Sequence, residues 1–236
     1  MKPLIIFKTG STFACLSDSI GDFEHWISAG LGQVAFPVKV IDPRQTDALP
    51  APEQCLAAII TGSHSMVSDR EPWSEHLASW LQQALALALP ILGICYGHQL
   101  LAHAMGGTVD YHPDGLEIGT VAIQLTHNAS SDQLFQALPP SFPAQVTHRQ
   151  TVRHLPETAV LLARNDFEPH HAFRIGTCAW GVQFHPEFSP QAMQVYIEQR
   201  SLSPDSRAAL LDGIASTPAA SSLLRKFAEL LMQPIS

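Results

Sequence analysis

The sequence is poor in cysteine, and it has no long hydrophobic run. The four cysteines are widely separated and form no C-x-x-C pair: Cys15, Cys55, Cys95 and Cys178. This spacing indicates neither a disulfide framework nor a zinc site, so each cysteine is judged by its own surroundings. No apolar stretch reaches the roughly 18 residues of a membrane span, and the opening PLIIFK is too short for a signal sequence. We therefore expect a cytoplasmic protein.

Positive charge is also scarce. The 236 residues include 13 lysines and arginines against 21 aspartates and glutamates, a formal net charge of −8, without any basic run. Nucleic acids and anionic membranes bind clustered positive charge, so neither is expected as a partner. The 12 histidines include no i, i+4 pair with an acidic companion, and we expect no metal. A small molecule or another protein is the expected partner.

Apolar runs alternate with helical patterns in the first hundred residues. Runs typical of buried strands cover residues 3–7, 34–41, 57–61 and 91–94, and helical patterns cover 23–31 and 72–89. This alternation predicts an α/β fold with an open, mostly parallel, flavodoxin-like sheet and helices on both faces.

The middle of the chain changes character. Shorter runs separated by turn residues predict additional, antiparallel strands at 119–125, 144–148, 159–163, 172–175 and 179–184. From about residue 190 the pattern is helical to the end, with a break at STPAASS. No linker divides the chain, so we expect a single domain over residues 1–236 with a helical tail.

Cys95 lies where a strand pattern changes to a helix pattern, in ILGICYGHQLLAHAMGG, residues 91–107. In an open α/β sheet, ligands bind beyond the carboxyl ends of the strands, which is where this thiol would lie. The unpaired N–H groups of a helix N-terminus stabilise a thiolate, and Gly93 and Gly97 permit the tight turn that an exposed nucleophile requires. A buried structural cysteine is the alternative, and the residues of this stretch alone do not decide between the two.

A second stretch, WGVQFHPEFSP at residues 180–190, ends an apolar run with His185 and Glu187. On an extended chain, residues two apart point to the same side, so the carboxylate could orient the imidazole toward a nucleophile. An ordinary strand end with a turn at Pro186 is the alternative, and H-x-E alone is common.

Together these stretches resemble the class I, or triad, glutamine amidotransferases. Their signatures are a G-x-C-x-G-x-Q elbow and a late H-P-E, which read here GICYGHQ (93–99) and FHPE (184–187) in the expected order. AIITGSHSMV (58–67) stands where the glutaminase domain of GMP synthase has a strand followed by a Gly-Gly-Pro turn. Three motifs in the same order make accident improbable.

The resemblance implies roles for the residues at matching positions. Cys95 would be the nucleophile, His185 the general acid and base, and Glu187 the group that orients His185. The oxyanion hole would consist of backbone N–H groups from Tyr96 and from the Gly62–Ser63 turn. Ser63 and the following histidine replace the second glycine and the proline of the family's turn.

Substrate-binding residues follow from the same resemblance. Gln99 matches the family's glutamine that contacts the amino-acid end of the substrate. VTHRQTVRHLP (146–156) resembles the family's S-H-x-D-x-V segment, in which Thr147 and His148 match in kind and Gln150 replaces the acidic residue. That replacement removes any role that requires charge at this position.

Three functions stay open. The chain is expected to be a glutaminase that forms a γ-glutamyl thioester on Cys95 and passes ammonia to a separate synthetase. It could instead hydrolyse γ-glutamyl amides or peptides without a partner, or be a non-catalytic binding or regulatory protein of the same fold. The sequence has no G-x-x-x-x-G-K-[ST] or S-G-G-x-D-S phosphate loop, so we expect no nucleotide or other cofactor on this chain.

Overall fold

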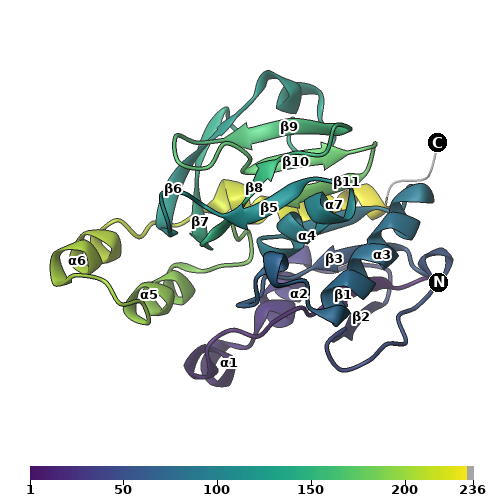
Figure 1. The fold of residues 1–236 in the computed structure, drawn as a ribbon, viewed down its shortest axis with the longest axis horizontal. Coiled ribbons are helices and arrows are strands. Elements are labelled where there is room, and N and C mark those ends of the chain that lie inside the picture. The colour runs from purple at the N-terminus through teal and green to yellow at the C-terminus, as the bar shows by residue number, and fades with distance from the viewer. Residues whose placement is uncertain (233–236) are drawn as a thin grey trace.

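A nine-stranded mixed sheet forms the centre of the molecule (Figure 1). The structure is a computed structural model and describes residues 1–232. The strand order is β2-β1-β3-β4-β11-β10-β9-β6-β7, and a separate two-stranded sheet pairs β5 with β8. In open α/β sheets, ligands bind beyond the carboxyl ends of the parallel strands, so this edge of the sheet is where a site is expected.

Five neighbouring strands are parallel. They are β1 (Leu4–Phe7), β2 (Val38–Ile41), β3 (Ala57–Ile60), β4 (Ile91–Ile94) and β11 (Ala179–Val182). Each pair along β2-β1-β3-β4-β11 runs in the same direction. If β11 is counted as the fifth strand, the order is the 2-1-3-4-5 arrangement of flavodoxin-like sheets. The predicted α/β flavodoxin-like fold is thus confirmed.

The rest of the sheet is antiparallel, as predicted. Its strands are β6 (Glu117–Leu125), β7 (Ser141–His148), β9 (Ala159–Arg164) and β10 (Ala172–Ile175). The run at 179–184, predicted to be antiparallel, forms β11, which runs parallel to β4 and antiparallel only to β10. The small second sheet pairs β5 (Thr108–Tyr111) with β8 (Gln150–His154). Only Arg149 separates β7 from β8, so the chain passes from one sheet to the other at this residue.

Helices cover both faces of the parallel half because its strands are apolar on both sides. Leu4 and Ile6 belong to a core shared with α2 (Phe23–Leu31) and α7 (Pro218–Met232). The alternate residues of β1, Ile5 and Phe7, pack with α3 (Pro72–Ala86) and α4 (Tyr96–Ala104) on the opposite face. Successive strand side chains point to opposite faces, which is why one strand serves two cores.

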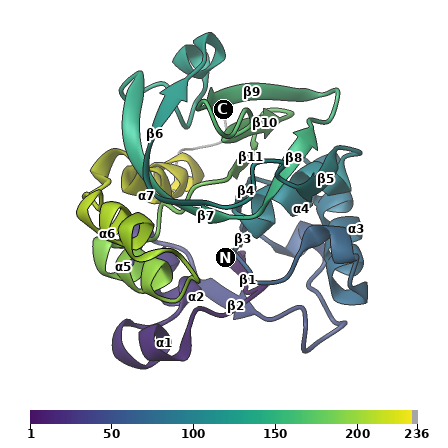
Figure 2. The same ribbon diagram turned by 60° about the vertical axis from the view of Figure 1, so that its left-hand side comes forward.

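A third, smaller core joins three helices beside the sheet. These are α1 (Ala14–Ile20), α5 (Pro190–Glu198) and α6 (Pro204–Asp212). Figure 2 shows them together on one side of the molecule. Leu16 of α1 and Tyr196 of α5 are buried in this core, whereas α6 has no buried residue. Short 3-10 turns complete the chain at η1 (Pro52–Gln54), η2 (Val67–Asp69) and η3 (His127–Ser131).

Several boundaries differ from those predicted. The run at 34–41 is a strand only at β2, and this strand is half exposed because it lies at the edge of the sheet. The helix predicted to reach residue 89 ends at Ala86, since Ala88 adopts a positive φ of 52° and Pro90 follows. The polar elements α1, β5 and β8 lack a strong apolar pattern, and the sequence does not predict them. Within residues 1–232, no helix is long and apolar enough to cross a membrane.

Candidate active site

The turn between β4 and α4 holds Cys95 in a strained conformation. Its φ of 51° and ψ of −99° are unusual for a residue with a side chain. Such strain costs about 1–3 kcal/mol and is concentrated at functional sites. A Cβ atom on Gly93 would lie 2.4 Å from the Gly97 carbonyl oxygen, and one on Gly97 would lie 2.5 Å from the Ile60 carbonyl oxygen. Only glycine fits either position, as the sequence predicts.

Cys95 is nearly buried at the N-terminus of α4. It is 6% exposed, and its backbone N–H donates to the Val182 carbonyl at 2.8 Å. Its Sγ atom lies 3.9 Å from the Thr147 carbonyl oxygen. Because β4 and β11 are parallel neighbours, the thiol lies at the same sheet edge as the segment that follows β11.

That segment carries His185 and Glu187. His185 donates from Nδ1 to Glu187 Oε1 at 2.8 Å, and its ring stacks on Phe188 with the centroids 4.1 Å apart. Its other nitrogen, Nε2, is buried and makes no hydrogen bond within residues 1–232. The sequence predicts that His185 and Glu187 lie on an extended chain. This prediction is wrong, because β11 ends at Val182 and both residues lie in the turn that follows.

Charge explains the protonation of His185. Burial lowers the pKa of this imidazole, but the carboxylate of Glu187 and the neighbouring sulfur of Cys95 outweigh it and raise the pKa to about 10. An opposite charge in a low-dielectric site favours the ionised form more strongly than it would in water. The imidazolium form is therefore the stable one at neutral pH, next to the thiol.

The Gly62–Ser63 turn follows β3 and borders both groups. A Cβ on Gly62 would lie 3.1 Å from His185 Cε1 and 3.8 Å from Cys95 Cβ. Ser63 donates its hydroxyl proton to the Thr9 carbonyl at 2.9 Å and accepts the Ser65 N–H at 3.1 Å. Serine in place of the family's glycine thus ties this turn to the loop that follows β1.

The three expected substrate-binding residues line the same pocket as Cys95, but they differ in how far their polar atoms are already hydrogen-bonded within the protein. Gln99 donates from Nε2 to the Gln150 carbonyl at 2.8 Å and to Gln183 Oε1 at 2.9 Å, so its amide nitrogen is occupied. Thr147 accepts a hydrogen bond on Oγ1 from Arg200 at 3.2 Å. His148 is part of a separate buried network.

His148 and Glu117 form a second buried pair. His148 Nε2 lies 2.8 Å from Glu117 Oε2, and its Nδ1 lies 2.9 Å from the Gln150 carbonyl oxygen. Both ring nitrogens therefore lie within hydrogen-bonding distance of an acceptor, and neither is free. Burial opposes ionisation of Glu117, but His148 and His171 hold the pKa of this carboxyl far below its usual range. The pair is locked in place.

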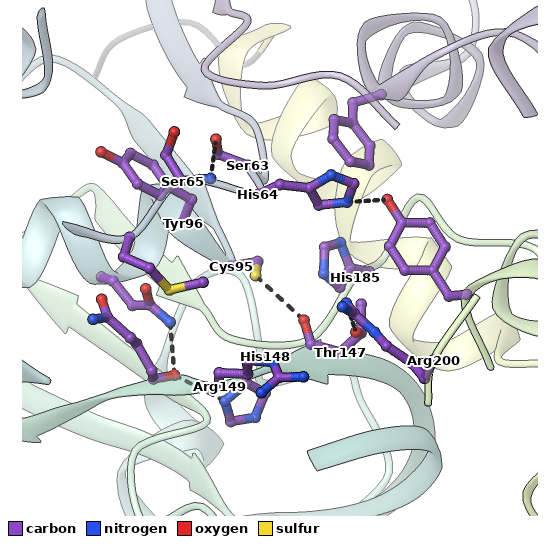
Figure 3. A pocket seen from close by; sticks show the side chains of 15 residues that line it. Ser63, His64, Ser65, Cys95, Tyr96, Thr147, His148, Arg149, His185 and Arg200 are labelled. Atoms are coloured by element: carbon purple, nitrogen blue, oxygen red, sulfur yellow. Dashed lines mark hydrogen bonds between the residues drawn. The ribbon is translucent and has the colours of Figure 1, made fainter. Parts of the chain in front are cut away.

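A pocket of about 90 Å³ opens at this sheet edge (Figure 3). It brings together all the predicted residues except Gly62 and Glu187, which lie directly behind it. Two of its other lining residues, His64 and Gln150, were noted in the sequence only as departures from the family's motifs. The rest were not singled out: Phe23, Ser65, Met66, Arg149, Tyr196 and Arg200. Arg149 lies inside a quoted motif, whereas nothing in the sequence pattern marks Arg200. Within residues 1–232, no cluster of three or more His, Cys, Asp or Glu residues is arranged to hold a metal.

Comparison with known proteins gives concordant results. The family model for glutamine amidotransferase class-I matches residues 15–203. The chain is 31% identical over 171 residues to one subunit of the GMP synthase (glutamine-hydrolyzing) of Methanopyrus kandleri, covering 72% of this chain and 86% of that protein. It is 38% identical over 130 residues to GMP synthase (glutamine-hydrolyzing) of Porphyromonas gingivalis, covering 55% of this chain and 24% of that protein. The match thus spans about a quarter of the longer synthase.

A solved structure has the same fold. A glutamine amidotransferase from Thermotoga maritima superposes with a TM-score of 0.76 at 20% identity, covering 99% of each chain. Similarity at this level of identity extends to the architecture of the sheet and helices, including the helices that follow residue 190.

Proposed function

This chain belongs to the class I glutamine amidotransferase family, and from that premise we propose that it hydrolyses γ-glutamyl amides through a thioester on Cys95. The observation that carries the proposal is the free Nε2 of His185, held beside Cys95 while Nδ1 is fixed on Glu187. A nucleophile, a base and a group that orients the base are the three parts that covalent acyl transfer requires.

In the first half-reaction, the Cys95 thiolate attacks the γ-carbonyl carbon of the substrate, and a C–S bond forms. The carbonyl oxygen takes the negative charge and accepts hydrogen bonds from the backbone N–H groups of Tyr96 and the Gly62–Ser63 turn. Removing one such donor costs roughly a hundredfold or more in rate. His185 Nε2 then gives its proton to the departing nitrogen as the C–N bond breaks, which leaves the thioester and free amine or ammonia.

In the second half-reaction, neutral His185 takes a proton from water, and the resulting hydroxide attacks the thioester carbon. The C–S bond breaks, glutamate leaves, and the thiolate and imidazolium are restored. The proton that His185 gave away in the first step is replaced by the one it takes here, so the cycle balances without a metal or a redox partner.

The fate of the nitrogen distinguishes two versions of this function. The relatives that are single subunits of GMP synthase support a role as a glutaminase that supplies ammonia to a separate synthetase. Hydrolysis of a γ-glutamyl amide or peptide without any partner uses the same residues. A non-catalytic role is disfavoured, because the strain at Cys95 and the buried polar pair behind it contribute nothing to binding alone.

The test is glutamate release by the purified protein from L-glutamine and from γ-glutamyl amides, with Cys95→Ala and Cys178→Ala compared side by side. We expect Cys95→Ala to lower turnover at least about a thousandfold and Cys178→Ala to change it little. Mass spectrometry after treatment with a glutamine-like electrophile should place the label on Cys95. Turnover that survives in Cys95→Ala, or label on another cysteine alone, would contradict the proposal.

A further inference from the structure

The charge of the pocket is opposite to that of the protein. The chain has a formal net charge of −8, yet the residues lining the pocket include Arg149 and Arg200 but no aspartate or glutamate. Its histidines add less, because His148 and His185 each face a carboxylate behind the pocket. Clefts lined by one sign of charge concentrate ligands of the opposite sign. The pocket is therefore built for an anion.

Arg200 is held in place without a carboxylate partner. It follows α5, and its Nη2 donates to Thr147 Oγ1 at 3.2 Å, while its carbonyl accepts from Arg207 Nη2 of α6 at 3.1 Å. Its Nε is buried and makes no hydrogen bond to any described residue. Neither Arg200 nor Arg149 forms an ion pair within residues 1–232. A guanidinium that is half buried and incompletely satisfied gains most from an anionic ligand.

The two arginines act on each other. Burial, and then the charge of Arg149, lower the pKa of Arg200. Because like charges held together repel, an anion that binds between or beside them relieves a cost already present in the free protein. Arg200 donates to Thr147 Oγ1, and the carbonyl oxygen of Thr147 is 3.9 Å from Cys95 Sγ.

The position of Arg200 identifies which end of the substrate it meets. Figure 3 shows His185 and Arg200 on one side of Cys95, with His148 and Arg149 below. The leaving nitrogen lies on the His185 side, because His185 Nε2 must reach it to donate a proton. Gln99 contacts the same Gln150 carbonyl as His148.

We propose that Arg200, assisted by Arg149, binds a carboxylate on the leaving group, so that γ-glutamyl amino acids are preferred over glutamine. This inference rests on the proposed amide hydrolysis at Cys95. In a γ-glutamyl amino acid, the second carboxylate is attached to the carbon next to the scissile nitrogen, within reach of a group beside the leaving site. The ammonia released from glutamine carries no such group. Arg200 is therefore a specificity-determining residue rather than a catalytic one.

The test compares kcat/KM for a γ-glutamyl dipeptide with that for the same compound amidated at its C-terminus. The two differ only in the carboxylate that Arg200 is proposed to bind. A charged hydrogen bond of this kind corresponds to roughly a 10- to 100-fold preference for the free acid. Arg200→Gln should bring the acid-to-amide ratio close to one, and Arg200→Lys should give an intermediate ratio because lysine cannot bind in bidentate fashion.

Arg149→Gln should lower the same ratio by less, since this side chain is more exposed. The matched control is Arg153→Gln, an exposed arginine on β8 that does not line the pocket; it should leave the ratio unchanged. A wild-type ratio near one, or an Arg200→Gln variant that loses acid and amide turnover by the same factor, would overturn the inference. In the second case Arg200 would hold the glutamyl carboxylate common to both compounds.

Calorimetric binding to Cys95→Ala keeps the test independent of turnover. If the free acid binds at least tenfold more tightly than the amide, and Arg200→Gln in the same background abolishes the difference, the inference is supported. Equal binding of both, or of neither, overturns it. Failure of the catalytic proposal has a separate signature, which is the absence of both Cys95-dependent turnover and Cys95 labelling.

Discussion

Within residues 1–232, two buried histidine–carboxylate pairs with the same N···O distance look alike and behave differently. His185–Glu187 and His148–Glu117 each have an N···O distance of 2.8 Å, and all four residues are buried. In the second pair the other ring nitrogen is bound to the Gln150 carbonyl. In the first pair the other nitrogen has no partner among the described residues and lies beside Cys95. The two pairs therefore differ in whether the second ring nitrogen of the histidine is free, and not in burial or in the presence of a carboxylate.

The difference has a simple chemical meaning. A histidine whose two ring nitrogens both face fixed acceptors has no free nitrogen to offer a substrate, so it contributes structure. A histidine that is fixed on one side only keeps its orientation while the other nitrogen exchanges a proton with a substrate. The same two residue types thus serve stability in one pair and, by our proposal, catalysis in the other.

The largest expected effect is on rate in the first pair. Glu187→Gln should lower kcat by about 10³–10⁴, since an amide no longer holds His185 in the required tautomer and charge state. The change should also lower the melting temperature at neutral pH, because His185 loses the carboxylate that stabilises its charged form. The measurement is glutamate release together with thermal unfolding. A Glu187→Gln enzyme with kcat within tenfold of wild type would break the distinction between the pairs.

The matching change in the second pair should act on stability. Glu117→Gln leaves His148 and His171 buried without their counter-charge, and breaking a buried pair typically costs about 3–5 kcal/mol. Urea unfolding should therefore show a lower midpoint than for the wild type, while the folded protein retains far more activity than Glu187→Gln. If Glu117→Gln lowered kcat as much as Glu187→Gln does, His148 would belong with the proposed catalytic residues.

The pairs should also govern opposite ends of the pH range. The pKa of His185 is raised to about 10, so its contribution to stability is complete below about pH 6.5 and is lost as the pH rises through about 10. The pKa of Glu117 is lowered, so its contribution is present above about pH 4.3 and is lost as the pH falls. Urea unfolding across this range should show Glu187→Gln flattening the alkaline side and Glu117→Gln flattening the acid side.

The smallest expected effect concerns the room around the free nitrogen. In Gly62→Ala, the new methyl group would lie 3.1 Å from His185 Cε1 and would displace the ring by a few tenths of an ångström. Since a 1 Å error in geometry costs about 10²-fold in rate, we expect a loss of roughly tenfold in kcat. Gly213→Ala is the control, because its methyl group would meet the Ala209 carbonyl oxygen at an ordinary 3.4 Å. Equal kcat for both variants would show that His185 does not need this space.

Local patterns predict much of the parallel half of the sheet. The bounds of β4 and α2 match the apolar runs at 91–94 and 23–31 residue for residue, because these segments are buried and their periodicity is strong. The edge strand β2 is placed less well, since an edge strand needs less apolar surface. The strands β5 and β8 escape prediction because their pairing depends on a partner about forty residues away and not on their own composition.

Only part of the candidate site can be predicted from the sequence, because some of its residues depend on partners that are far away in the chain. Cys95, its two glycines and the His185–Glu187 segment are recognisable because each function depends on neighbouring residues in the chain. Arg200 carries no local signal, because its hydrogen-bond partner Thr147 lies 53 residues away in sequence. A residue that reaches the site from a distant helix or strand has no local sequence pattern that predicts its position there.

The sequence by itself determined the α/β alternation, the elbow at Cys95 and the family, since these are written in short stretches whose backbone geometry admits few residue types. Only the tertiary structure decided that His185 keeps a free nitrogen beside Cys95, and which arginines face the pocket. Two histidines of identical chemistry differ because their neighbours come from strands far apart in the chain. Hydrogen-bond saturation is a property of three-dimensional surroundings, and it is this saturation that divides His148 from His185.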